Sequence, residues 1–367
     1  ILGSFLGILI LLMLLATICD HSKVSYDHLQ KVEPDSVEKL ADGGSVVELT
    51  IDKSVKKCTT VAFCTPHQYV DVYVDGRDVY SLKETAGRWG HTTGHVWNFV
   101  LLPVNTTHLT VKLSPCYPET ANALLTYYVG NGREICMGLM RQSLPTFIIS
   151  FIILIVGIYM LGYWLLVCKS EDVDATLLYL GLFSVILGLW TANETNFAKL
   201  LLVNQHATTF AAYILLMAMP IPFVLFVRSF LDFDDKNIWR VFCGFSMVMC
   251  VISCVLHFTG IWELRQSLIL THIVIVGLLI YLMRAIVFKF VKRQVGRRLR
   301  TCIAALILVI LASIADLINY YKVGGNTGIW GRISFLIFIV ILGVESASKT
   351  ASMLRRDRRV KELEQFA

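Results

Sequence analysis

Long apolar stretches recur along the chain and give it its first organisation. A helix needs about 20 predominantly apolar residues to cross the ~30 Å hydrocarbon core of a bilayer. Eight stretches meet or approach this length, and they predict helices near Ile1–Cys19, Pro145–Val167, Leu177–Ala192, Phe210–Val227, Trp239–Leu256, Leu268–Phe288, Cys302–Tyr320 and Ile333–Ser346. The last seven follow one another closely. The pattern therefore predicts a membrane protein with a block of seven spans.

The first stretch stands apart from the other seven. Its place at the start of the chain is typical of a secretory signal, either cleaved or kept as an anchor, and we assign residues 1–19 to it. Residues 20–143 are polar and are predicted to form one domain outside the membrane. We assign residues 144–348 to the seven-span region and residues 349–367 to the start of a cytoplasmic helix.

Within residues 20–143 the apolar period changes from that of a helix to that of a strand. In QYVDVYVDGRDVY every second residue from Val70 to Val74 is valine, and the Asp-Gly pair that follows is typical of a β-hairpin turn. SVVELTI and HLTVKL show the same alternation. Short alternating strands with frequent turns indicate a β-sandwich or jelly roll. The predicted fold is an extracytoplasmic β-sandwich or jelly-roll domain, followed by a seven-helix transmembrane bundle and a short cytoplasmic helix.

Composition and charge agree with a membrane protein and predict its orientation. The chain is 56% hydrophobic, 16% of its residues are charged, and its mean hydropathy is +0.65. Lysine and arginine gather in FKFVKRQVGRRLR and MLRRDRRVKELEQFA. Because cytoplasmic loops accumulate these residues, the C-terminus is predicted inside and residues 20–143 outside. The net charge of +6 follows from this bias, and we expect no nucleic-acid partner.

Four polar residues near one face of the predicted membrane region are candidates for a ligand site. Ionisable side chains are costly inside a bilayer, which makes each a functional candidate. The residues are Glu194, His272, Asp316 and Asn319, and the predicted topology puts them at a similar depth near the outer face. They could form a polar pocket in which the histidine pairs with a carboxylate. Alternatively, each side chain reaches the interface or makes one interhelical hydrogen bond.

A second candidate ligand site lies in GRWGHTTGHVWNF of the outside domain. This stretch contains Trp89, His91 and His95. The histidines could bind a metal ion, and the tryptophan could stack on a sugar ring. Two histidines without a Cys or carboxylate at ligand spacing are a weak metal signal, so we predict no metal site and no cofactor. The alternative is that the histidines are solvated loop residues and that Trp97 and Phe99 belong to the core.

The cysteines divide between the outside domain and the spans. Four of the ten lie in the outside domain, where an oxidising compartment permits disulfides, and these are Cys58, Cys64, Cys116 and Cys136. Four cysteines allow three pairings, and the sequence does not choose between them. We interpret the other cysteines as small apolar residues in or near spans.

Three stretches carry a resemblance to a known family. LYLGLFSVILGLWTANETN runs through Leu and Gly to a Trp and an Asn-Glu pair, and TPHQYVDVYVDGRDVYS and HVWNFVLLPVNTTHLTVKLSPCYP lie in the outside domain. Together with the order of signal segment, outside domain and seven spans, they resemble the bacterial seven-transmembrane receptors with diverse intracellular signalling modules. The resemblance covers almost the whole chain.

The resemblance implies a receptor in the bacterial plasma membrane whose spans pass a signal to a cytoplasmic output module. That module is most often a diguanylate cyclase with a Gly-Gly-Asp-Glu-Phe motif. We find no such module in this sequence, and we expect no enzymatic activity within the chain. We interpret MLRRDRRVKELEQFA as the beginning of a helix that leads to the output module. A basic amphipathic tail on anionic lipid is the alternative.

We therefore expect a two-state receptor in the lipid bilayer that binds an unidentified outside ligand and works as a homodimer. The alternatives are a transporter or other polytopic membrane protein, and a free-standing receptor or scaffold that acts through a separate cytoplasmic partner. A transporter needs a charged path through its spans, whereas here the ionisable residues collect at the two faces. VRSFLDF and IVILGVESASKT also lack the Asp-Arg-Tyr and Asn-Pro-x-x-Tyr signatures of receptors coupled to G proteins.

Overall fold

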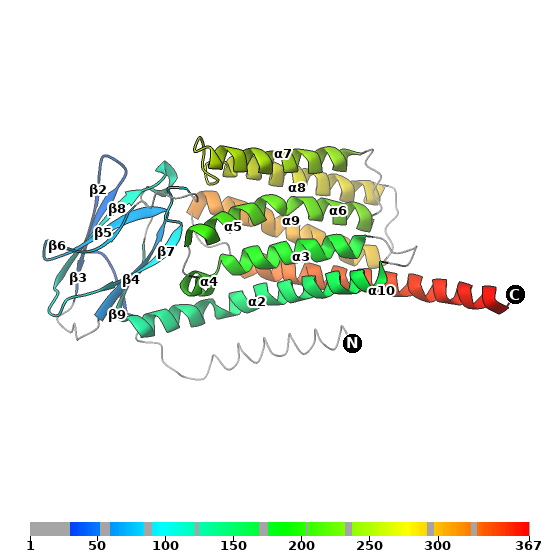
Figure 1. Cartoon of the computed structure of the whole chain (residues 1–367), viewed down its shortest axis with the longest axis horizontal. Helices are drawn as coiled ribbons and strands as arrows, with labels where there is room; N and C mark the ends of the chain where they lie inside the picture. The colour runs from blue at the N-terminus through cyan, green and yellow to red at the C-terminus, as the bar shows by residue number, and fades with distance from the viewer. Residues whose placement is uncertain are drawn as a thin grey trace. The chain divides into compact units, whose positions relative to one another are not determined.

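The chain folds into two compact units (Figure 1). The structure is a computed structural model, and it describes residues 30–51, 59–83, 90–121, 125–168, 175–202, 205–231, 237–291, 297–323 and 329–366. One unit extends to Pro145 and also includes Asn193–Ala212, and we call it the sandwich unit. The other contains Thr146–Ala192 and the chain from Tyr213 onward, and we call it the helical unit. The expected signal segment, Ile1–Cys19, lies outside the described residues.

The sandwich unit contains two antiparallel sheets. The first has the strand order β1-β9-β4-β7 and consists of β1 (Gln30–Val32), β9 (Tyr127–Asn131), β4 (Thr59–Pro66) and β7 (His95–Leu101). The second has the order β2-β3-β8-β5-β6 and consists of β2 (Ser36–Lys39), β3 (Ser45–Thr50), β8 (His108–Pro115), β5 (Gln68–Val74) and β6 (Arg77–Leu82). The predicted β-sandwich is confirmed, and the narrower jelly-roll assignment stays a prediction.

The core of the sandwich follows from the period-two pattern. Strand β5 alternates between buried valines and partly exposed residues, so one of its faces turns inward. Both sheets contribute to the cluster of buried residues, which contains Val47, Leu49, Ile51, Val61, Phe63, Val70, Val72, Val74, Val100, Leu102, Leu109, Val111, Leu113 and Tyr127. Asp75 and Gly76 form the predicted hairpin turn, with φ of 47° and 78°, the left-handed values that such turns require.

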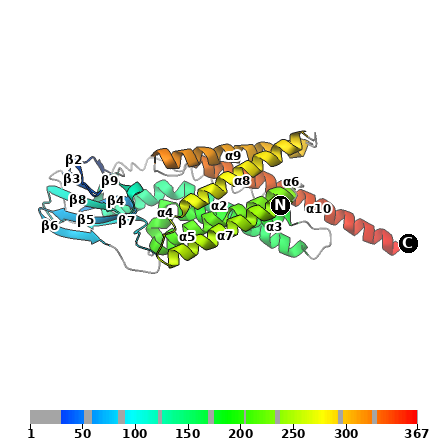
Figure 2. The same ribbon diagram turned by 90° about the horizontal axis from the view of Figure 1, so that it is seen from above.

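Helices cover all seven of the apolar stretches predicted after residue 143. They are α2 (Gly132–Val167), α3 (Thr176–Asn193), α5 (Gln205–Ala218) with α6 (Pro220–Leu231), α7 (Ile238–Phe258), α8 (Leu268–Val291), α9 (Arg297–Val323) and α10 (Ile329–Phe366). Six stretches of the described residues are long and apolar enough to cross a membrane, and α9 holds a shorter apolar part, Ile303–Asp316. In the helical unit, α6, α7 and α8 pack against one another and α9 packs against α10 (Figures 1 and 2).

The third predicted span is interrupted by its two prolines. Helix α5 ends at Ala218 and α6 begins at Pro220, so the break falls at Met219. Pro220 and Pro222 lack the N–H groups that would continue the helical hydrogen bonds, and proline is favoured in the first turn of a new helix. The prolines therefore divide one predicted span into two helices.

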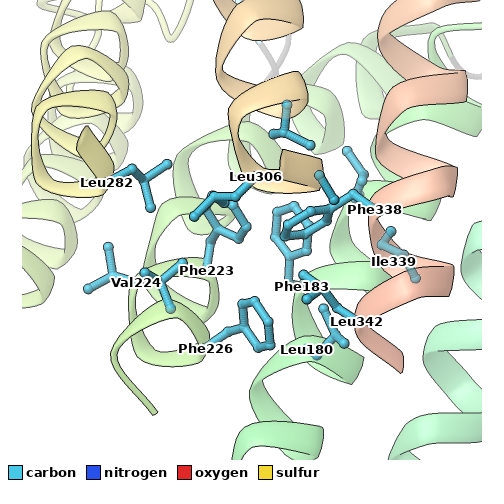
Figure 3. Close-up of a cluster of buried hydrophobic side chains, with 14 of the residues drawn as sticks. Leu180, Phe183, Phe223, Val224, Phe226, Leu282, Leu306, Phe338, Ile339 and Leu342 are labelled. Carbon is cyan, nitrogen blue, oxygen red and sulfur yellow. The ribbon is translucent and has the colours of Figure 1, made fainter. Parts of the chain in front are cut away.

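Aromatic and aliphatic side chains fill the centre of the helical unit. Phe183 of α3 stacks on Phe223 of α6 with ring centroids 4.5 Å apart, and Phe338 of α10 meets Phe223 edge to face at 5.7 Å (Figure 3). Leu282 of α8 and Leu306 of α9 complete this centre. These side chains come from five helices. The core therefore links α10 to α3, α6, α8 and α9.

Helices α2 and α3 approach each other through glycines. A Cβ atom on Gly188 would lie 2.7 Å from the backbone nitrogen of Leu154, and one on Gly157 would lie 2.8 Å from the backbone nitrogen of Val185. Contacts this short leave no room for any side chain. Small residues at helix interfaces allow backbones to pack closely in membranes, where packing supplies much of the association energy.

The polar C-terminal segment continues the last predicted span as one helix. Helix α10 runs for 38 residues, from Ile329 to Phe366, without a break. The predicted helical conformation of MLRRDRRVKELEQFA is therefore confirmed up to Phe366, and Ala367 lies outside the described residues.

Candidate functional site

The outer face of the first sheet carries a group of aromatic side chains. Trp97 and Phe99 of β7 alternate with Asn98 and Val100, which are buried on the opposite side. The ring centroids of Trp97 and Phe99 are 6.5 Å apart, and those of Trp97 and Tyr128 are 6.2 Å apart. Trp97 and Phe99 are thus absent from the core between the sheets, where one interpretation of the sequence placed them. They belong to a separate cluster on the outside of the sheet.

Two segments outside the sheets pack on this aromatic face. The first turns of α2 contribute Ile135 and Leu139, which are 0% and 1% exposed. The segment Asn193–Ala212 contributes Leu200. The whole cluster contains Ala62, Trp97, Phe99, Tyr128, Ile135, Leu139 and Leu200. Helix α2 therefore begins at Gly132, well before the predicted span at Pro145, because its first turns have an apolar side to bury on the sheet.

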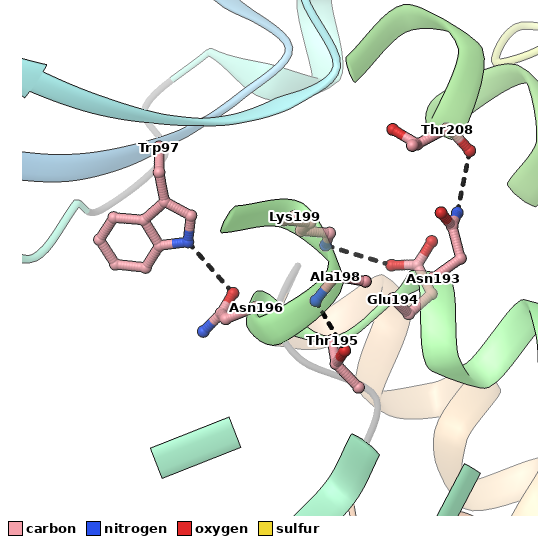
Figure 4. A network of polar contacts seen from close by, with 8 residues as sticks. All are labelled: Trp97, Asn193, Glu194, Thr195, Asn196, Ala198, Lys199 and Thr208. Atoms are coloured by element: carbon pink, nitrogen blue, oxygen red, sulfur yellow. Dashed lines mark hydrogen bonds and ion pairs between the residues drawn. The ribbon is translucent and has the colours of Figure 1, made fainter. Parts of the chain in front are cut away.

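The segment Asn193–Ala212 contains a short helix that the sequence did not predict. Helix α4 (Asn196–Leu201) is capped by Thr195, whose Oγ1 accepts a hydrogen bond from the N–H of Ala198 at 3.3 Å (Figure 4). Trp97 donates from Nε1 to Oδ1 of Asn196 at 3.3 Å, across 99 residues of sequence. Asn193 donates from Nδ2 to the carbonyl of Thr208 at 2.9 Å, which closes the segment on itself.

An ion pair links Lys199 of α4 to Glu194, which lies two residues before the helix begins. Nζ of Lys199 lies 3.4 Å from Oε2 of Glu194, and the two side chains are 12% and 30% exposed. An ion pair that is partly shielded from water is stronger than one on an open surface. The polar network and the aromatic face together make Asn193–Ala212 part of the sandwich unit.

Replacing Lys199 with methionine is expected to destabilise the sandwich unit by about 1–2 kcal/mol. The substitution keeps an apolar stem and leaves the partly buried Glu194 carboxylate without its ammonium. Thermal unfolding of the purified chain measures the effect. The double change Glu194→Gln with Lys199→Met should cost less than the two single changes combined, and additive effects would show that the two charges are not coupled.

The Cys64 thiol lies next to this network on β4. Burial raises its pKa from 9.0 to about 11, although the nearby Lys199 ammonium acts in the opposite direction. Cys64 and Cys136 are both free thiols, so no disulfide uses either of them in this structure. Cys58 lies outside the described residues.

The raised pKa predicts that Cys64 reacts slowly with thiol reagents. At pH 8 a thiol with a pKa near 11 is ionised on the order of a hundredfold less than an ordinary one, and only the thiolate reacts. Iodoacetamide labelling with peptide mass spectrometry should modify the exposed Cys168 first. Because folding raises this pKa, its contribution to stability is present below pH 9 and is lost as the pH rises towards 11. Equal labelling rates for Cys64 and Cys168 would contradict this environment.

The histidines of the second predicted site have different surroundings. His91 is exposed, and its carbonyl accepts a hydrogen bond from the Tyr69 hydroxyl at 2.9 Å. His95 packs edge to face on the buried His67, with centroids 4.9 Å apart, and Nδ1 of His67 is hydrogen bonded to Thr92. Trp89 lies outside the described residues. Within the described ranges, no three His, Cys, Asp or Glu side chains gather closely enough to hold a metal ion.

The four polar residues of the first predicted site are divided between the two units. Glu194 belongs to the sandwich unit and pairs with Lys199. His272 and Asp316 belong to the helical unit, where Asp316 of α9 lies so close to Gly331 of α10 that a Cβ there would collide with the carboxylate. The side chain of Asn319 lies outside the described part of the structure. A shared pocket for these residues stays a prediction.

Trp97, Asn196 and Lys199 are the site residues that sequence reasoning missed. The polar string ANETN directly after an apolar span was a visible signal, since Thr195 is a preferred helix cap and Lys199 follows Glu194 by five residues. The partner of Asn196 was not visible, because it lies in a different strand far away in sequence.

Comparison with known proteins identifies the family of this arrangement. The model of the family described as 7TM diverse intracellular signalling matches residues 145–346, more than half of the chain. A comparison with curated proteins gives no match. The matched region includes α3, the Asn193–Ala212 segment and most of the apolar part of α10. The chain therefore belongs to the 7TM diverse intracellular signalling family and is a multi-pass transmembrane signalling receptor, as the resemblance indicated.

Proposed function

We propose that the sandwich unit binds a ligand outside the cell and that the Asn193–Ala212 segment passes the binding event to the membrane helices. The observation that carries this proposal is the docking of α4 on the aromatic face of the sandwich, through Trp97 to Asn196 and through Leu200. This segment lies within the region that matches the receptor family, yet it packs into the sandwich unit.

Chain connectivity makes the segment suited to this role. It directly follows α3, which ends at Asn193, and it contains the first turns of α5. A ligand that changes the position of β7 would move Asn196, and with it the ends of both helices. Binding shifts a two-state equilibrium only through different affinities for the two states, and a hundredfold difference corresponds to about 2.7 kcal/mol.

The output side of the proposal rests on α10 and on the family. Helix α10 shares the aromatic centre of the bundle through Phe338 and then continues as a polar helix to Phe366. Its rotation or shift would be passed to a cytoplasmic output module, for which a diguanylate cyclase is our proposal, and a second copy of the chain would supply the facing helix. The ligand would bind at the end of the sandwich that carries His91 and His95.

A cyclase reporter joined in frame after α10 tests the proposed function. Cells that express this receptor are screened with carbohydrates and peptides for a change in cyclic dinucleotide output. Asn196→Ala should remove most of the response while the purified receptor still binds the same compound. The matched control is Gln142→Ala, an exposed position of α2 in the same unit. A response that is equal in the wild type and in Asn196→Ala would contradict the relay.

A further inference from the structure

Two arginines share one tryptophan ring where α6 ends and α7 begins. The Cζ atom of Arg228 in α6 lies 4.6 Å from the ring centroid of Trp239 in α7, and that of Arg240 lies 5.3 Å from it. Both arginines are exposed, and the tryptophan is partly buried. All three residues belong to the helical unit and lie near the end of α6 and the beginning of α7.

This arrangement concentrates positive charge and leaves the N–H donors of the two guanidinium groups available to a ligand. A cation over an aromatic face is attracted by the ring but receives no hydrogen-bond acceptor from it, so the five N–H donors of each guanidinium still need acceptors. Among the described residues, neither Arg228 nor Arg240 lies in an ion pair with a carboxylate. Two like charges held near one ring also repel each other, and an anion between or beside them relieves that repulsion.

We propose that Arg228 and Arg240, oriented by Trp239, bind the phosphate group of an anionic lipid headgroup. The planar guanidinium matches a phosphate with two parallel hydrogen bonds, and a side chain already fixed on an aromatic ring loses less freedom on binding. Tryptophan and arginine at the end of a membrane helix lie at headgroup depth, and basic groups there bind acidic lipids.

The test compares lipid binding by variants with the same net charge. The full chain is reconstituted in nanodiscs that contain phosphatidylglycerol in phosphatidylcholine, and retained anionic lipid is counted by native mass spectrometry. Arg228→Gln with Arg240→Gln is expected to weaken binding roughly tenfold, the effect of losing charge-assisted hydrogen bonds. Arg284→Gln with Arg355→Gln removes two exposed arginines elsewhere and is the matched control, expected to change binding less than about threefold.

Further variants separate the site from general attraction and from loss of folding. Arg228→Lys with Arg240→Lys keeps the positive charge but loses the planar guanidinium that makes two parallel hydrogen bonds. Binding should therefore fall between wild type and the glutamine pair. Asp232, Asp234 and Asp235 are the nearest acids in the sequence and lie outside the described residues, and their change to asparagine should strengthen binding. Three results would overturn the proposal. The glutamine pair and its control could lose lipid binding equally, the glutamine pair could lose none, or the aspartate changes could weaken binding.

A soluble phosphate is the other possible source of the same group. The detergent-solubilised chain is titrated with inorganic phosphate and followed by phosphorus NMR line width. The lipid proposal expects weak phosphate binding and no displacement of phosphatidylglycerol by millimolar phosphate. Displacement that depends on Arg228 and Arg240 would assign the site to a soluble phosphate compound and overturn the lipid as its ligand.

Discussion

Replacing Gly188 with leucine is expected to disrupt the helical unit. A side chain at this position meets the backbone of Leu154 at 2.7–2.8 Å, and backbone atoms cannot rotate away as a flexible side chain can. Overpacking of a close contact costs about 1–3 kcal/mol, and separation of α2 and α3 would add lost contacts. The expected result is a thermal midpoint lower by several degrees in detergent, and a smaller yield of folded receptor.

The matched control for this prediction is Gly162→Leu on α2. A Cβ at Gly162 would meet no atom within 4 Å, so the leucine there enters open space. Both substitutions add the same side chain to a glycine inside a membrane helix and differ only in their surroundings. Equal thermal midpoints for the two variants would show that α2 and α3 do not pack through Gly188.

Replacing Trp97 with alanine is expected to release the Asn193–Ala212 segment from the sandwich. The ring packs on Phe99 and Tyr128 and donates to Asn196, so the change removes both apolar contacts and a hydrogen bond. Because Trp97 is only partly buried, we expect a loss near the lower end of measured Trp to Ala effects, about 3 kcal/mol. Thermal unfolding followed by near-ultraviolet circular dichroism measures it.

Two further substitutions divide this effect into its parts. Trp97→Phe keeps one ring for packing but removes the Nε1 donor and part of the apolar contact, which should cost about 1–2 kcal/mol. Leu101→Ala alters the same strand, but its side chain is 65% exposed, so it should cost well under 1 kcal/mol. A Trp97→Ala variant as stable as Leu101→Ala would mean that the aromatic face is not covered.

Local patterns were enough to predict the long helices and several strands of this fold. The alternating valines of Val70–Val74 lie in β5, the Asp75–Gly76 turn has the expected backbone, and the seven apolar runs after residue 143 lie in helices. Each of these features depends on neighbours within a few residues of the chain. The period of a sequence reports which side of an element is apolar, and β3, β5 and β8 of the second sheet bury the side that the period indicated.

Features that depend on distant contacts were not predictable in the same way. The period of β7 shows that Trp97 and Phe99 share a face, but not that this face is the outer one. Six residues are too few to give a clear helical period, and α4 is stabilised by the packing of Leu200 on the aromatic face of the first sheet. The early start of α2 has the same cause, since Ile135 and Leu139 lie one turn apart on its sheet-facing side.

Hydrogen exchange at α4 tests the central claim that this segment is held by the sandwich. An isolated helix of six residues is unstable in water, so slow exchange of its amides requires packing. The amides of Lys199 and Leu202, which donate to Thr195 and Ala198, should be protected in the wild-type receptor. In Trp97→Ala we expect their protection to fall at least tenfold while peptides of α7 remain unchanged. Equal protection of these amides in the wild type and in Trp97→Ala would contradict the claim that the sandwich holds α4. Fast exchange of these amides in the wild type would contradict it as well.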